Sequence, residues 1–156
     1  MEPQPNDLKA IRILYLALLA GQILFALIVT VLVETGMLST GMNSLTPLLQ
    51  VAVVVIAAVT IPASFFLFRK RLSGIDPEDD LGKKIEKYRA ALILRLALCQ
   101  MPSMFAVIAY FITNNRSFLW MIIILISNFL FIYPGRDKII SQLQLNSSEQ
   151  SSLGID

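Results

Sequence analysis

Four long runs of apolar residues constrain this sequence more than any other feature. They cover residues 11–33, 47–68, 90–113 and 117–133, and no other run is long enough to cross a bilayer. A helix needs about 20 mostly apolar residues to cross the ~30 Å hydrocarbon core. The period-two alternation typical of membrane barrel strands is absent, so helices are the structure that satisfies every backbone group in lipid. The sequence therefore predicts an all-α integral membrane protein in which four transmembrane helices form a single domain over residues 1–156.

Composition excludes several other classes of protein. Hydrophobic residues make up 56% of the chain and charged residues 15%, whereas soluble domains average about 45–50% and about 25%. The single cysteine and the absence of histidine argue against a disulfide framework and a zinc site, and they remove the commonest general base. A net charge of +2 is too small for a nucleic-acid binder. We therefore expect neither metal nor cofactor, and no nucleic-acid partner.

Positive charge predicts the orientation of the four spans. The side that holds the N-terminal arm, the loop 69–89 and the tail 134–156 carries 12 of the 13 Lys and Arg residues, counting the first turns of the adjoining helices. The other side carries Arg116 alone. The positive-inside rule then places both termini and the loop 69–89 in the cytoplasm, which predicts a multi-pass protein of the bacterial inner membrane.

The chain also resembles itself. Residues 8–28 and 88–108 match at nine of 21 positions when aligned with a shift of 80. Two hairpins of the same orientation would form a parallel repeat about an axis along the membrane normal. Coincidence in a sequence dominated by a few apolar residue types is the alternative, and the comparison favours the repeat over it by a small margin.

The loop 69–89 carries segregated charges. Asp76 and Pro77 suit the N-cap and first position of a helix, which predicts that the third helix begins near residue 77. Basic clusters flank an acidic loop tip, and the candidate surface for membrane lipids or a protein partner comprises Arg69, Lys70, Arg71, Glu78, Asp79, Asp80, Lys83 and Lys84. Near-surface Lys and Arg side chains suit anionic head groups. The alternative is that the basic clusters set the topology and the acids cap the helix.

A layer of neutral polar residues lies at depth in the predicted spans. Its candidate members are Gln22, Thr60, Ser64, Gln100, Ser103 and Asn128. Such residues either hydrogen-bond between helices, at ~0.6 kcal/mol per contact on average, or line a polar cavity for a small uncharged solute. Four packed helices leave little room for a cavity, so hydrogen bonding is the favoured interpretation. Arg95 is close enough to the inner end of its helix for its side chain to extend to water.

No ionisable side chain lies near the midplane of a predicted span, and neither a metalloprotease motif nor a phosphate-binding glycine loop is present, so enzymatic activity is not expected. The tail residues Ile139, Ile140 and Leu143 share one helical face, which predicts a short amphipathic helix at the inner membrane surface.

Two segments carry a resemblance to known proteins. The Tyr-Pro-Gly-Arg-Asp-Lys-Ile-Ile stretch at 133–140 and the Leu-Ala-Leu-Leu-Ala-Gly-Gln-Ile-Leu-Phe-Ala stretch at 16–26 are similar to small uncharacterised bacterial inner-membrane proteins with four spans. The resemblance implies the architecture and assigns no activity. We expect a non-enzymatic accessory or interaction subunit that forms a small oligomer or binds a protein partner. The alternative is a channel or transporter for a small uncharged solute.

Overall fold

The computed structural model describes residues 6–37, 41–76, 78–143 and 145, and the elements within these ranges are all helices. In chain order they are α1 (Asn6–Glu34), the 3-10 turn η1 (Asn43–Leu45), α2 (Thr46–Leu72), α3 (Leu81–Thr113), α4 (Ser117–Leu130) and α5 (Arg136–Leu143). Three of them, α1, α2 and α3, are long and apolar enough to cross a membrane. The prediction of a helical protein with several apolar helices of membrane-spanning length is thereby confirmed.

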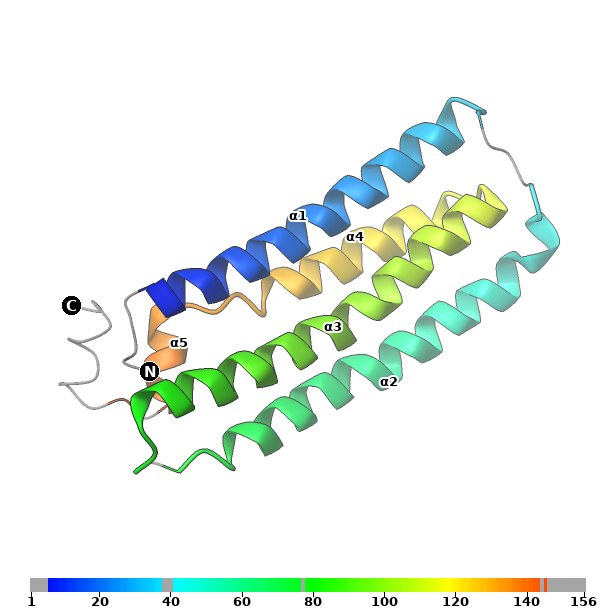
Figure 1. Cartoon of the computed structure of the whole chain (residues 1–156). Coiled ribbons are helices and arrows are strands. Elements are labelled where there is room, and N and C mark those ends of the chain that lie inside the picture. Colours follow the sequence, from blue (N-terminus) through cyan, green and yellow to red (C-terminus); the bar gives the residue numbers. More distant parts are fainter. Residues whose placement is uncertain (1–5, 38–40, 77, 144, 146–156) are drawn as a thin grey trace.

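The helices form an elongated bundle with α3 at its centre. Helix α3 packs against α1, α2, α4 and α5, whereas α1 and α2 pack against α3 rather than against each other (Figure 1). Burial follows this arrangement, because the apolar stretch of α3 is about twice as buried as that of α1 or α2. We call the end that holds the start of α1, the loop 73–80 and α5 the inner end, and the opposite end the outer end. These names follow the predicted orientation.

Helix α4 is shorter than the span predicted over residues 117–133. It is α-helical for 14 residues and ends at Leu130, which corresponds to about 21 Å of helix. The backbone N–H groups of Ile132 and Tyr133 then donate to the carbonyls three residues earlier, a tighter pattern typical of helix ends. Pro134 explains the ending, because it disfavours the α conformation at the residue before it. Helix α2 has 27 residues, so the two hairpins differ in length, and the internal repeat stays a prediction.

The start of α3 corrects the sequence-based prediction, which placed it near residue 77 with Asp76 as N-cap. The helix begins at Leu81, and Asp80 is its N-cap, with a carboxylate that accepts from the Gly82 N–H at 3.2 Å. Asp76 instead accepts the Glu78 N–H at 3.0 Å, which makes a separate turn before the helix. Both aspartates satisfy backbone donors, and the sequence alone did not distinguish them. Pro77 lies outside the described residues.

The outer end is held by a tight turn and an ion pair. Asn114 ends α3 in the left-handed conformation, with φ of 52°, which asparagine tolerates better than most residues. The guanidinium of Arg116, in the following turn, pairs with Glu34 at the end of α1, with Nη2 and Oε2 2.9 Å apart. The Tyr110 hydroxyl donates to the same carboxylate at 3.2 Å. These contacts fasten α1 to the α3–α4 turn.

Helix α5 confirms the short helix predicted in the tail, but its apolar face has a different neighbour. Ile139 and Leu143 are buried in the cluster that also contains Tyr88, Leu92 and Phe129 of the bundle. The apolar side of α5 therefore packs into the bundle against α3 rather than lying freely on a lipid surface. The predicted tail beyond residue 145 is outside the described residues.

Candidate functional site

The first candidate site is the polar layer, where the structure brings together side chains of α1 and α3. The Gln22 amide nitrogen of α1 donates to the Ser103 hydroxyl of α3, and both side chains are fully buried. The Ser103 hydroxyl in turn donates to the Gln100 carbonyl oxygen at 2.8 Å. A buried hydrogen bond near the middle of α1 therefore joins α1 to α3. The Gln22 amide oxygen is buried without a hydrogen-bond partner.

The remaining members of the layer lie apart from this pair. The Ser64 hydroxyl of α2 bonds the Ile61 carbonyl at 2.6 Å and lies 3.1 Å from the Cys99 sulfur of α3. Thr60 has a buried hydroxyl with no partner, and Asn128 of α4 is half-buried. Within the described part of the chain, a side-chain to side-chain hydrogen bond among the six is therefore found only between Gln22 and Ser103, and hydrogen bonds do not join the six into one lined passage.

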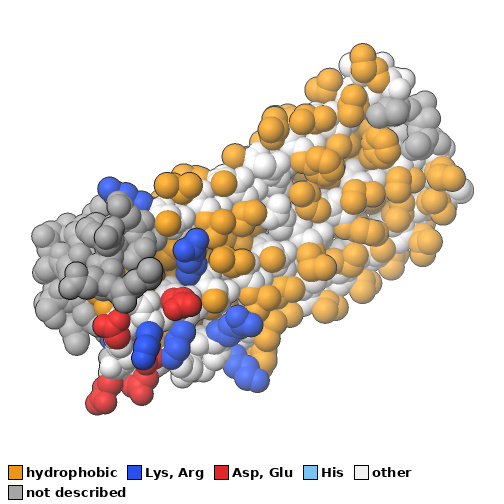
Figure 2. All heavy atoms as spheres, in the orientation of Figure 1, with side chains coloured by type: hydrophobic (Ala, Val, Ile, Leu, Met, Phe, Trp, Pro, Cys, Tyr) orange, Lys and Arg blue, Asp and Glu red, His pale blue; other side chains and the backbone are white. Residues whose placement is uncertain are grey.

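The second candidate site is the charged surface at the inner end. Figure 2 shows Lys, Arg, Asp and Glu side chains gathered near this end, while hydrophobic side chains cover the rest of the face. The side chains of Arg69, Lys70 and Arg71 are exposed in the last turn of α2, where cations interact favourably with the helix dipole. Glu78, Asp80 and Lys83 are also exposed in and after the loop. The exposed charges thus form a surface on the loop 73–80 and the adjoining helix ends.

Two members of the predicted surface behave differently. Lys84 is 1% exposed, because it lies on the face of α3 that carries the buried residues Leu81, Ile85 and Tyr88. It therefore does not belong to the exposed surface. Asp79 is partly covered and accepts a hydrogen bond from the Lys87 ammonium. This bond holds the pKa of the Asp79 carboxyl below its ordinary value, and it fixes the loop against the first turns of α3.

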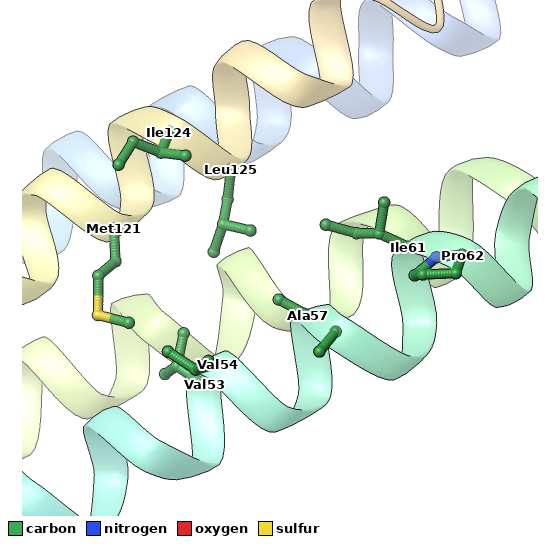
Figure 3. A pocket seen from close by; sticks show the side chains of 9 residues that line it. Val53, Val54, Ala57, Ile61, Pro62, Met121, Ile124 and Leu125 are labelled. Atoms are coloured by element: carbon green, nitrogen blue, oxygen red, sulfur yellow. The ribbon is translucent and has the colours of Figure 1, made fainter.

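A third feature, absent from the sequence-based expectations, is an open apolar groove between α2 and α4. It encloses about 500 Å³, and every residue that lines it is apolar: Val53, Val54, Ala57, Ala58, Ile61, Pro62, Met121, Ile124 and Leu125. Figure 3 shows that Met121 and Leu125 point from α4 towards the α2 side chains across the gap. The small side chains of Ala57 and Ala58 leave this space unfilled. The sequence shows alanines in α2 but not which helix they face.

Arg95 is the residue whose surroundings the sequence did not reveal. Its guanidinium carbon lies 4.2 Å from the centroid of the Phe65 ring and 4.7 Å from that of the Phe68 ring. Both distances are within the range of attractive cation–π interactions. The Nε atom of Arg95 is buried without a hydrogen-bond partner. The sequence does show aromatic residues at 65–68 of α2 that could contact a cation. Only the packing of α2 against α3 shows that this cation is Arg95.

Comparison with known proteins yields no relative. No model of a protein family matches the chain, and no curated protein or solved structure matches it. The function therefore has to be argued from the geometry of the chain itself.

Proposed function

We propose that this protein is a non-enzymatic, multi-pass protein of the bacterial inner membrane that acts as an accessory subunit and binds a protein partner through its cytoplasmic inner end. The observation that carries the proposal is the distribution of polar groups among the described residues. Exposed charges gather at the inner end (Figure 2), whereas the polar side chains of the predicted layer are buried or half-buried in the bundle. The groups available for recognition are thus those on the loop 73–80 and its flanks.

The shape of the inner end supports this assignment. The loop is fixed rather than free, because Asp76, Asp79 and Asp80 each hold a backbone group or the Lys87 ammonium. A loop that is already ordered loses less conformational entropy when it binds. The charges in and beside the loop have both signs, so they can match a partner by charge complementarity, which gives specificity.

The buried hydrogen bonds of the polar layer support the accessory role over transport. A passage for a polar solute requires polar groups that face an open space, and the groove in the spanning region is lined by apolar side chains. One observation favours the alternative, a channel or transporter for a small uncharged solute. The Gln22 amide oxygen and the Thr60 hydroxyl are buried without hydrogen-bond partners, and such groups are costly to leave unsatisfied.

The partner-binding proposal is tested by neutralising two acids of the loop while keeping the cap of α3. The variant Glu78→Gln/Asp79→Asn removes two negative charges and keeps the Asp80 cap of α3. Native purification in mild detergent followed by quantitative mass spectrometry should show that proteins recovered with the wild type are depleted with the variant. Two controls are Glu86→Gln, an exposed acid on α3, and Lys87→Gln, which breaks the same ion pair without neutralising an acid.

Equal recovery of partners with the loop variant and with Glu86→Gln would contradict the proposal. Loss of partners with Lys87→Gln as well would show that the ion pair and the loop conformation matter. The transport alternative is tested separately, by measuring solute uptake into liposomes that contain the wild type or Gln22→Leu. Uptake that depends on Gln22 would replace the accessory role.

A further inference from the structure

A cationic cavity lies at the inner end of the bundle. It encloses about 450 Å³ between α2, α3 and the segment that joins α4 to α5. Three of its lining residues carry positive charge, namely Arg69 of α2, Arg95 of α3 and Lys138 of α5, and none of the described lining residues is acidic. Three cations from three helices therefore converge on one space in which no described side chain supplies a counter-charge.

The polar atoms of this cavity are incompletely satisfied. The Nε atom of Arg95 is buried without a hydrogen-bond partner, and so is the side-chain oxygen of Gln142 on α5. Lys138 donates to the Phe131 carbonyl at 3.2 Å, and this acceptor is neutral. An unsatisfied buried donor on a cation is costly, and a charged oxyanion satisfies it well. The chemistry of the lining thus fits a phosphate with a hydroxyl-bearing substituent, whose hydroxyl would donate to Gln142.

The position of Arg95 indicates where such a phosphate comes from. Arg95 follows residue 90, the predicted start of the third span, by five residues, or about 7.5 Å of helix. Charged residues at this depth pair with a counter-charge or reach the interface. Because the described part of the lining offers no carboxylate, a lipid phosphate at the membrane surface is the anion that suits this depth. Basic pockets between membrane helices on the cytoplasmic side are suited to anionic lipid head groups.

The apolar groove lies along the same face of α2 as this cavity. Helix α2 lines the groove through Ala57 and Ile61 and the cavity through Phe65 and Arg69, and residues four apart share one face of a helix. On the opposite side, helix α4 lines the groove, and the segment that follows it lines the cavity. From Ala57 to Arg69 the helix rises about 18 Å, close to the ~15 Å depth of one leaflet of the hydrocarbon core. The two spaces together have the polarity and the length of one phospholipid.

We propose that the cavity and the groove together bind one anionic phospholipid. Its phosphate pairs with Arg69, Arg95 and Lys138, and an acyl chain occupies the groove between α2 and α4. The site goes beyond the accessory role and does not depend on it, because it shares only Arg69 with the charged surface and none of the acidic residues of the loop.

Lipid binding is measured by native mass spectrometry of the protein in detergent, titrated with phosphatidylglycerol, phosphatidylcholine or inorganic phosphate. We expect phosphatidylglycerol to bind in preference to both other probes. The variant Arg69→Gln/Lys138→Gln should weaken that binding about thirtyfold, on the basis of ~1 kcal/mol per cation. The matched control is Arg71→Gln/Lys83→Gln, which removes two exposed cations outside the cavity lining. Both pairs change the net charge equally.

The groove is tested by Ala57→Phe, which fills it, against Ala20→Phe at an exposed position of α1. Only the first should weaken binding of phosphatidylglycerol. Equal weakening by the two charge pairs, equal binding of phosphatidylcholine, or phosphate binding as tight as lipid binding would each overturn the proposal. Unchanged affinity with Ala57→Phe would show that no acyl chain occupies the groove, and this result would also overturn the proposal. Arg95→Gln should also weaken binding of phosphatidylglycerol. If the Arg95→Gln protein does not fold, the Arg69→Gln/Lys138→Gln variant still tests the proposal.

Discussion

Tyr15 of α1 contacts Phe129 of α4 in two ways at once. The rings stack with centroids 5.4 Å apart and an angle of 18°, and the Tyr15 hydroxyl donates to the Phe129 backbone carbonyl at 3.1 Å. The Phe129 carbonyl also accepts the Ile132 N–H at 3.1 Å, so the Tyr15 hydroxyl is a second donor to it near the end of α4. A single side chain thereby ties α1 to the last turn of α4.

Tyr15→Phe should lower the free energy of unfolding by about 0.5–1.5 kcal/mol, because the ring stacking remains while a buried hydrogen bond is lost. The measurement is unfolding in detergent followed by circular dichroism. Tyr133→Phe is the matched control, because the Tyr133 ring contacts the Tyr15 ring edge-on and Tyr133 is itself exposed. A loss of stability as large in the control would show that the Tyr15 hydroxyl has no special role.

The Gln22–Ser103 bond predicts a measurable coupling between α1 and α3. In a double-mutant cycle with Gln22→Leu and Ser103→Ala, the coupling free energy should be about 0.6 kcal/mol, with ~1.7 kcal/mol as the upper range for membrane proteins. Gln100→Leu supplies a control, because Ser103 bonds the backbone carbonyl of Gln100 and not its side chain. Additive effects of Gln22→Leu and Ser103→Ala would contradict the bond.

Two aspartates near the start of α3, Asp76 and Asp80, should differ in their contribution to the stability of the protein. Asp80→Ala removes the N-cap and should cost about 1 kcal/mol of stability. Asp76→Ala, chosen as its control, removes only the turn before the helix and should cost less. The measurement is the unfolding midpoint in the same detergent. A larger effect at Asp76 would restore the helix start that the sequence predicts near residue 77.

The Asp79–Lys87 pair predicts a dependence of stability on pH. The pKa of Asp79 is below its ordinary value in the folded protein because of its hydrogen bond from Lys87. The pair therefore stabilises the fold above the ordinary pKa, about 3.9, and this contribution disappears as the pH falls through the lowered value. The difference in unfolding midpoint between wild type and Asp79→Asn should thus shrink on acidification. Lys87→Gln should behave like Asp79→Asn, and a difference that stayed constant with pH would contradict the assignment.

The predicted orientation has a direct test at described, exposed positions. Single cysteines at Ser44 and Ser73, introduced into a Cys99→Ser background, lie at the outer and inner ends. An impermeant thiol reagent added to spheroplasts should label Ser44→Cys and leave Ser73→Cys unlabelled until the membrane is opened. The reverse labelling would place the termini outside the cell and invert the positive-inside assignment.

Sequence reasoning predicted the helical architecture well because the apolar runs of α1, α2 and α3 are long and continuous. It missed the end of α4 because the run continues to Tyr133 while Pro134 already disturbs the backbone. It also chose Asp76 over Asp80 as the cap, since both precede α3 and both have the right side chain. These errors concern boundaries, where one or two local hydrogen bonds decide.

The candidate sites depended on information that a sequence does not contain. Gln22 and Ser103 were both predicted to lie in a polar layer, but only the packing of α1 on α3 shows that they bond to each other. Arg95 was interpreted as a side chain extending to water because its neighbours on α2 were unknown. Residue type predicts depth in the membrane, whereas contacts depend on which helix faces meet.

The central position of α3 has a consequence for biosynthesis. Helices α1 and α2 emerge from the ribosome before the helix against which both pack. In the proposed membrane topology each must therefore remain stable in lipid alone, and both are more apolar than α3. On the same proposal, helix α3, with Arg95, Gln100 and Ser103 in its sequence, enters a membrane that already holds its two partners. Because of this order along the chain, the least apolar of the three long helices is inserted last, after both of the long helices that it packs against.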